Sequence, residues 1–234
     1  MLISMSESGV DAVRQRHPAM RETAVFVIPM GHYRGVYQDV VTREQARESL
    51  GIPDRARVIS FIGQVREYKN IPQLVKAFRS LDGEDPVLLI AGKPRPESVR
   101  EAIVATARGD ARVRLELRFI PDDEVQVYLR AADLVALSYR DILNSSTALL
   151  ALSFDRPVLV PRKGAMGDLK RTTGDDWVRT YDGEISTQLL RDGLEWATAA
   201  DRPPRPQLAA LDWDRIAGMT VDAFRQLAAG STAR

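Results

Sequence analysis

Short apolar runs alternate with amphipathic segments along most of this chain. Five runs, rich in β-branched and aliphatic residues, predict strands: 58–62, 86–91, 113–119, 133–138 and 156–161. A sixth, shorter strand is expected at 177–181, and helical periodicity fills the segments between the strands. Regular alternation of strand and helix predicts an α/β fold, namely a Rossmann-like, doubly wound parallel sheet with helices on both faces. The run at 113–119 alternates apolar with charged residues, which predicts a strand at the sheet edge.

Both ends of the chain fall outside this alternation. The first residues predict a short strand and a serine-capped helix that ends at His17-Pro18, and 24–28 predicts another strand. A proline-rich linker covers 201–206, and an amphipathic helix is expected from Trp213 to Ala229.

The composition excludes several classes of protein. The 234 residues contain 33 Lys and Arg against 32 Asp and Glu, a balance that gives no argument for nucleic acid or an anionic membrane as the main partner. Without cysteine there are no disulfides, thiolate metal sites or cysteine nucleophiles, and with two histidines no metal site is expected. We see no signal peptide and no apolar run of roughly 20 residues, so we expect a cytoplasmic protein without a strong membrane signal.

The sharpest local signal is the segment that follows the strand at 58–62. Gly63 ends the strand, Arg66 and Lys69 follow in a loop, and Pro72 lies in the first turn of the next helix. Backbone N–H groups and the dipole at a helix N-terminus favour a phosphate, and the two cations add full charge. The alternative is that both cations are solvated loop residues.

A polar run lies where another loop becomes a helix, at Asn144, Ser145, Ser146 and Thr147. Short hydroxyl and amide side chains cap helices, and they also leave room for a phosphate against the free N–H groups. Capping explains one of these residues well but explains a run of four poorly.

Two further strand ends carry weaker signals. Lys93, in a turn after the second strand, either reaches an anionic ligand or is an exposed cation of a proline-stiffened turn. Phe119 and Ile120 end the third strand, where they could hold a flat base, although core packing is the stronger interpretation of their side chains.

Known catalytic motifs do not appear in the chain. There is no Ser-His-Asp arrangement, no paired carboxylates, no Walker-type loop and no Gly-x-Gly-x-x-Gly, so a kinase or a nicotinamide dehydrogenase has no support.

The order of the motifs resembles one family. The chain is similar, over about residues 25–230, to the C-terminal, nucleotide-sugar-binding domain of GT-B-fold retaining glycosyltransferases of family four, the glycosyl transferases group 1 domain. The segments that carry the resemblance are Ile28-Pro-Met-Gly-His32, Phe61-Ile-Gly-Gln-Val-Arg-Glu-Tyr-Lys69, Ala91-Gly-Lys-Pro94, Phe119-Ile-Pro-Asp-Asp-Glu-Val125, Ala131-Ala-Asp133, Arg156-Pro-Val158 and Trp213.

The resemblance implies a role for the loop after the first strand of the sheet. Lys69 would bind the diphosphate of the donor, next to Gly63. The arginine that the family carries beside this glycine is Gln64 here, and Arg66 is our candidate to replace it. With Ser145 at a helix N-terminus, Lys69 and Arg66 would stabilise the charge that develops on the leaving diphosphate.

The resemblance is incomplete at the sugar and ribose contacts. Two glutamates of the family fall on Ile142 and Leu150, and neither is acidic. Asp141, one position away, is the candidate substitute for the first, which completes the candidate catalytic set of Lys69, Arg66 and Asp141.

The implied function is transfer of a sugar, with retention, from a nucleoside-diphosphate sugar to an unknown acceptor, with no cofactor besides this donor. Residues 1–22 would be a remnant of the N-terminal acceptor domain and its linker, and 23–234 the donor domain with its C-terminal helix. An N-terminal acceptor domain or a partner chain would complete the cleft. Two alternatives stay open: a truncated or degenerate, non-catalytic module that binds nucleotide or a partner, and a sugar-phosphate or nucleotide-binding protein of another α/β family.

Overall fold

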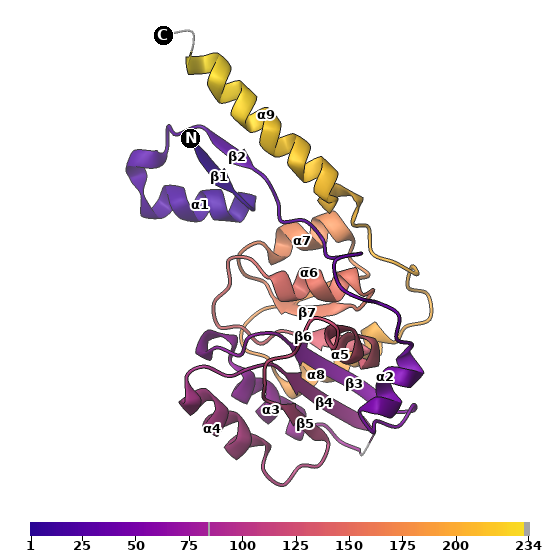
Figure 1. The fold of residues 1–234 in the computed structure, drawn as a ribbon. Helices are drawn as coiled ribbons and strands as arrows, with labels where there is room; N and C mark the ends of the chain where they lie inside the picture. Colours follow the sequence, from indigo (N-terminus) through magenta and orange to yellow (C-terminus); the bar gives the residue numbers. More distant parts are fainter. Residues whose placement is uncertain (84, 232–234) are drawn as a thin grey trace.

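The computed structural model describes residues 1–83 and 85–231, and a six-stranded sheet lies at its centre (Figure 1). All neighbouring strands of this sheet pair in parallel, in the order β5-β4-β3-β6-β7-β8. The strands are β3 (Arg57–Ile62), β4 (Pro86–Ala91), β5 (Val113–Glu116), β6 (Leu134–Ala136), β7 (Val158–Pro161) and β8 (Val178–Tyr181). The predicted α/β class and parallel sheet are confirmed.

The strand order reverses between β3 and β6. From β3 the chain winds outward to β4 and β5, then returns to place β6 on the other side of β3. Right-handed crossovers in this order put the helices of the two halves on opposite faces, which makes the sheet doubly wound. Ligands of such sheets bind beyond the carboxyl ends of the strands at which the order reverses, and here the loops that leave β3 and β6 follow those strand ends.

The helices lie close to their predicted positions. They are α2 (Arg43–Ser49), α3 (Ile71–Arg79), α4 (Glu97–Ala107), α5 (Val125–Ala131), α6 (Ser146–Ser153), α7 (Met166–Thr173) and α8 (Thr187–Ala197). Thr42 caps α2 through a complete capping box with Gln45, as the Thr-x-x-Gln spacing indicates.

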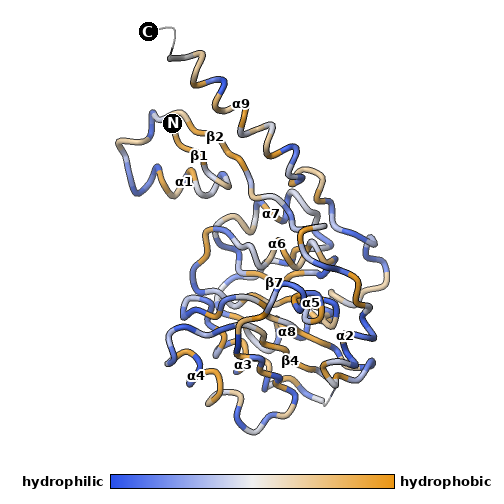
Figure 2. Tube along the Cα trace, in the orientation of Figure 1, coloured by the Kyte–Doolittle hydropathy of each residue, from blue (hydrophilic) through white to orange (hydrophobic). Residues whose placement is uncertain are grey.

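The core is continuous around β3 and β4. Every residue of β4, and every residue of β3 after Arg57, is buried, which explains why both strands consist almost entirely of apolar residues (Figure 2). β5 is an edge strand, as predicted, and its residues are only partly buried. It ends at Glu116, because Glu116 pairs with Ala91, the last residue of its neighbour β4. Beyond the strand, Arg118 pairs with Glu116 and Glu124 at the surface.

The N-terminal residues form a small unit of their own. β1 (Leu2–Ser4) and β2 (Val25–Val27) pair in parallel, and α1 (Glu7–Arg16) connects them with Ser6 as its N-cap. The long helix α9 (Trp213–Ser231) runs beside these two strands and away from the six-stranded sheet (Figure 1). The predicted N-terminal strand and helix are confirmed, whereas the assignment of 1–22 to a remnant domain stays a prediction.

The apolar positions of α9 divide between two environments. Ile216 and Ala223 are buried against Ile28, whereas Val221 and Phe224 are 47% and 56% exposed. Part of the predicted apolar stripe therefore covers β2, and the rest faces solvent.

Two chain segments cross between the small unit and the sheet: the first follows β2, and the second precedes α9. Gly31 lies against the indole of Trp213, where a β-carbon would come within 2.4 Å of the ring. His32 pairs with Asp212 at 2.6 Å, and Trp213 donates its indole N–H to the backbone carbonyl of His32 at 2.8 Å. His32 therefore connects the two segments through its side chain and its backbone carbonyl. A lone histidine in a loop is usually a polar surface residue, and this interpretation is wrong for His32.

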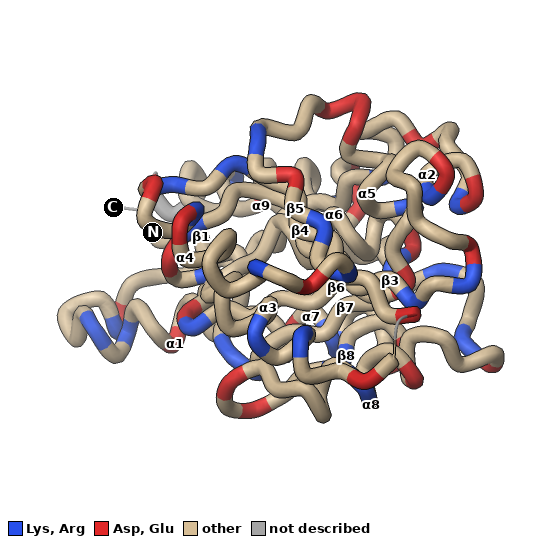
Figure 3. Tube along the Cα trace, turned by 90° about the horizontal axis from the view of Figure 1, so that it is seen from below, with Lys and Arg blue, Asp and Glu red and all other residues tan. Residues whose placement is uncertain are grey.

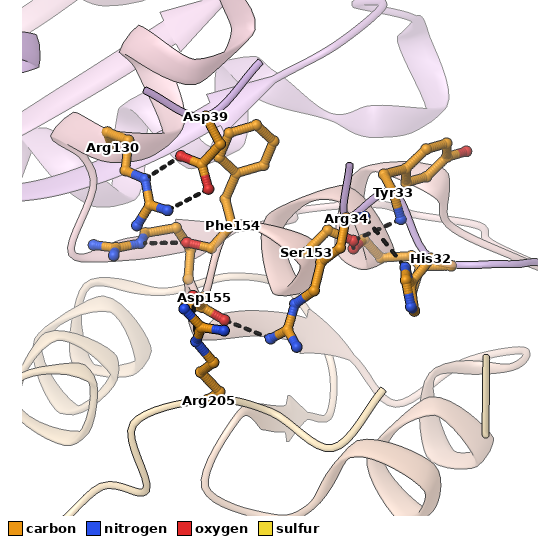
Figure 4. A network of polar contacts seen from close by, with 11 residues as sticks. His32, Tyr33, Arg34, Asp39, Arg130, Ser153, Phe154, Asp155 and Arg205 are labelled. Atoms are coloured by element: carbon orange, nitrogen blue, oxygen red, sulfur yellow. Dashed lines mark hydrogen bonds and ion pairs between the residues drawn. The ribbon is translucent and has the colours of Figure 1, made fainter. Parts of the chain in front are cut away.

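The first crossing segment is also anchored to the end of α6. Arg34 pairs with Asp155 at 2.6 Å, and the Tyr33 N–H donates to the Ser153 hydroxyl at 2.9 Å (Figure 4). Arg205, from the second segment, approaches the other oxygen of Asp155 at 3.8 Å. Asp155 therefore connects both crossing segments to the sheet domain.

Candidate functional site

Lys69 lies at the carboxyl end of β3. The strand ends at Ile62, Gly63 follows with φ at +125°, and a single 3-10 turn over Glu67–Lys69 leads into α3. This turn draws the Lys69 side chain inward, where only 6% of the residue is exposed. The interpretation of Lys69 as a solvated loop charge is therefore wrong.

Hydrogen bonds connect the loop after β3 to the loop after β6. The Ser138 hydroxyl donates to the backbone carbonyls of Lys69 at 2.8 Å and Asn70 at 3.2 Å. The Arg140 N–H donates to the carbonyl of Tyr68 at 2.8 Å. These hydrogen bonds hold the two loops at the reversal of strand order in a fixed relation.

The Lys69 ammonium group has no carboxylate partner among the described residues. It lies 5.2 Å from the ring centre of Phe61 and 5.3 Å from that of Tyr139. Within residues 1–83 and 85–231 it forms no ion pair. Burial, with a smaller contribution from Arg66, lowers its pKa from 10.5 to about 8. Two aromatic faces compensate only part of the lost hydration, so the site favours an incoming anion.

The N-terminus of α6 opens toward this ammonium group. Ser145 caps the helix by accepting the Ala148 N–H at 3.1 Å, so the capping interpretation is confirmed for this residue. A β-carbon at Gly63 would lie 3.2 Å from the Thr147 hydroxyl and 3.8 Å from Lys69 Nζ. Gly63, Lys69 and Thr147 therefore come together from three different segments, and the free N–H groups of the first turn of α6 add partial positive charge.

Gly92 packs the turn after β4 against the same loop. Its φ is +147°, and a β-carbon there would lie 1.8 Å from the backbone oxygen of Gly63, so only glycine fits. The Val65 N–H donates to the Lys93 carbonyl at 3.2 Å, while the Lys93 side chain is exposed.

Phe119 and Ile120, although adjacent in sequence, lie in different environments. Ile120 is 9% exposed and belongs to the core, as its stronger interpretation predicts. Phe119 is 68% exposed, so core packing is wrong for this side chain. The cause is the early end of β5, which leaves Phe119 in a loop without a facing layer. The exposed ring is available to a flat ligand.

The remaining candidates are exposed side chains. Gln64 is exposed and accepts a hydrogen bond from Arg66 at 3.1 Å. Asn144 and Ser146 are exposed beside the Ser145 cap. Asp141 accepts the N–H of Ile142 at 2.9 Å and lines a cleft of about 820 Å³ between its loop and α1.

The two positions of the family's glutamates are apolar packing positions in this fold. Ile142 is 7% exposed, and Leu150 packs against the main core. Neither side chain can contact a sugar or ribose by hydrogen bonding, as the sequence indicates.

Phe61, Ser138 and Tyr139 were not assigned to the site from sequence. Phe61 reads as a core residue of a buried strand, which it also is. Ser138 and Tyr139 follow β6, and only their position at the end of a predicted strand indicates in the sequence that they could contact a ligand. Their partner Lys69 is far away in sequence, so only the folded chain shows the contacts.

Charges of both signs are interspersed over the face seen in Figure 3. Within the described residues, no three His, Asp or Glu side chains gather in a way that could hold a metal ion. None of the helices in this part of the chain is long and apolar enough to cross a membrane.

Comparison with known families agrees with this geometry. The sequence model of the family Glycosyl transferases group 1 matches residues 42–160, which include β3 to β6, most of β7, and the Lys69 and α6 segments. The chain belongs to this family, and the alternative of an unrelated α/β family is thereby wrong.

Curated relatives are longer proteins. GDP-mannose:glycolipid 4-beta-D-mannosyltransferase of Xanthomonas campestris is 33% identical over 186 residues, which cover 80% of this chain and 51% of the relative. D-inositol 3-phosphate glycosyltransferase of Rhodococcus jostii is 30% identical over 200 residues, covering 78% and 43%. The chain spans about half the length of the curated relatives it matches.

Solved structures share the fold over nearly the whole chain. Sucrose-phosphate synthase of Thermosynechococcus elongatus superimposes with a TM-score of 0.77 at 21% identity, over 97% of this chain and 58% of that one. Anabaena HepE, in complex with UDP-glucose, gives 0.71 at 15% identity, over 97% and 63%. The chain therefore has the fold of one half of a GT-B glycosyltransferase.

Proposed function

We propose that this chain is the donor-binding half of a glycosyltransferase. The diphosphate of a nucleoside-diphosphate sugar would occupy the space between Lys69, Gly63 and the N-terminus of α6. The observation that carries the proposal is the buried Lys69 ammonium group, which has no carboxylate partner in the described residues. Its charge and the helix dipole would stabilise the leaving diphosphate as the bond to the sugar breaks.

The nucleoside and the sugar would lie on opposite sides of the diphosphate. Phe119 would stack on the base, because its ring is exposed at the carboxyl end of β5. Arg66 and Lys93 would add positive charge at the edge. Asp141 faces the cleft next to α1, where it would contact the transferred sugar or the acceptor.

A preceding acceptor-binding half, in the same polypeptide or in a partner chain, would complete the cleft. The matched part of this chain covers only about half of the curated relatives, and β1, β2, α1 and α9 form a unit apart from the main sheet.

Calorimetric titration with UDP, GDP and ADP, and with their sugar conjugates, tests the donor site. We expect one diphosphate to bind, and the Lys69→Ala variant to weaken it at least tenfold, the effect of removing a charged hydrogen-bonding partner. Lys76→Ala is the matched control, because Lys76 is an exposed lysine of α3. Absence of binding by the folded, unchanged chain would contradict the proposal.

The stereochemistry of transfer needs its own measurement. The family resemblance implies retention, whereas the name of the Xanthomonas relative specifies a β-linked product. With an α-linked donor, retention gives an α product and inversion a β product. The NMR coupling at the anomeric carbon of the product, formed with the acceptor half supplied, decides between them.

The second candidate function is a non-catalytic nucleotide-binding or partner-binding module. Ile142 and Leu150, both packed as core residues, favour it. Donor binding without hydrolysis or transfer, with the acceptor half present, would support this alternative.

A further inference from the structure

Tyr139 lies beside Lys69 in the candidate site. The residue is 5% exposed. Its ring centre lies 6.4 Å from that of Phe61 and 5.8 Å from that of Tyr68, both edge-on, and 5.3 Å from Lys69 Nζ. Contacts on three sides fix the orientation of this ring.

The hydroxyl of Tyr139 is buried and forms no hydrogen bond within the described residues. Burial raises its pKa to about 12, and the adjoining hydroxyls of Thr147 and Ser145 oppose this increase. The phenol is therefore protonated at neutral pH and is a hydrogen-bond donor without an acceptor. A buried donor in this state is costly unless a ligand completes its surroundings.

The hydroxyls of Thr147 and Ser145 adjoin Tyr139, and either has a lone pair that can accept its proton. The Ser145 hydroxyl is already engaged by the Ala148 N–H. The Thr147 hydroxyl faces the space above Gly63, where Lys69 Nζ also lies. A hydroxyl has one proton to donate and two lone pairs, so accepting from Tyr139 would free its proton to point toward that space.

We propose that Tyr139 is a positioning residue of the phosphate site, which directs the Thr147 hydroxyl proton to the bound diphosphate and holds the Lys69 ammonium group against its ring. The inference rests on the proposed function, because it presumes that the diphosphate occupies this space. In the complex, a chain of hydrogen bonds from Tyr139 through Thr147 would polarise the final donor and strengthen its bond to the anion.

A double-mutant cycle tests this inference. The diphosphate that binds the unchanged chain best is titrated into Tyr139→Phe, Thr147→Val and the double variant. We expect each single variant to weaken binding about tenfold, the usual effect of losing a hydrogen bond to a charged group. The double variant should be no weaker than Thr147→Val alone, because Tyr139 would act through Thr147.

Two controls separate positioning from packing. Thr147→Ser keeps the hydroxyl and should bind like the unchanged chain. Tyr139→Phe keeps the ring over Lys69, so the pH at which binding is lost should not move. Each variant is also melted, to show that it is folded at the temperature of the titration.

The outcomes distinguish this inference from the proposed function. If the unchanged chain binds no diphosphate, both are overturned. If it binds but Tyr139→Phe binds equally well, or if the effects of the two single variants multiply in the double variant, only the role of Tyr139 is overturned. Because Thr147→Val tests the same relay from its other end, normal binding by that variant also overturns it.

Discussion

Diphosphate binding should weaken as the pH rises above 8. The pKa of Lys69 in the unliganded protein is about 8, because burial disfavours its charged form. A bound diphosphate favours that form again and raises the pKa toward its ordinary 10.5. Binding is therefore coupled to the uptake of a proton wherever the free protein has lost it.

The size of the effect follows from these two pKa values. If the pKa in the complex returns to 10.5, affinity falls about thirtyfold between pH 7 and pH 9.5, or ~2 kcal/mol. At pH 8 about half a proton should be taken up per diphosphate bound, because half of the free protein carries neutral Lys69. The terminal phosphate of the ligand is already ionised there, since its last pKa is near 6.

The assay is calorimetry at pH 8 in two buffers with different enthalpies of ionisation. The difference in apparent binding enthalpy gives the number of protons taken up. Lys69→Met should show little uptake, and Lys76→Met, which removes an exposed lysine of α3, should behave like the unchanged chain. Affinity that stays within about twofold from pH 7 to 9.5 would refute the assignment of Lys69 as the phosphate-binding cation.

Three further predictions concern stability. Without ligand, Lys69→Met should stabilise the fold by about 1–3 kcal/mol at pH 7, because it removes a buried charge. This gain in stability should shrink between pH 8 and 10.5, because Lys69 in the native protein then holds fewer protons than in the unfolded protein. Urea unfolding at pH 7 and 10 checks this, and a destabilised variant would contradict it. Arg47→Met should cost about 3–5 kcal/mol in the same experiment, because the buried guanidinium pairs with a carboxylate and binds three backbone carbonyls; a loss below 1 kcal/mol would show that the pair is dispensable. Gly92→Ala should destabilise the fold by more than about 2 kcal/mol and weaken diphosphate binding, because its β-carbon would collide with the oxygen of Gly63. Gly109→Ala, at a positive φ with open space, is the control, and it should leave binding unchanged.

The sheet was predictable because its signals are local. β3 and β4 are continuous apolar runs, and a residue buried on either face of a parallel sheet must be apolar whatever its neighbours are. The charged alternation at 113–116 likewise marks an edge strand. Lys69 was predictable as a candidate because it follows a strand and a glycine, the usual place for a ligand in such folds.

The burial of individual loop residues was not predictable in the same way. Core packing is predicted for Phe119, but β5 ends at Glu116, which pairs with the last residue of β4, and no local pattern in the third run encodes where its neighbour ends. The contact between Lys69 and Tyr139 joins loops that are distant in sequence. It exists because the strand order reverses between β3 and β6.

Buried cations elsewhere in this fold show what makes Lys69 different. Arg47 is fully buried, and it is paired with Asp133 and bound to backbone carbonyls. Burial lowers the pKa of Arg156 to about 10, and its guanidinium donates to the carbonyls of Phe154 and Ala132. Both cations stabilise the contacts of the sheet domain, so their charge is compensated by the chain itself. Lys69 has two aromatic rings and, in the described residues, no carboxylate or carbonyl acceptor for its ammonium group. Lys69 is not compensated in this way by the described residues, at the place where the strand order reverses. This difference supports the proposal that an anionic ligand binds there.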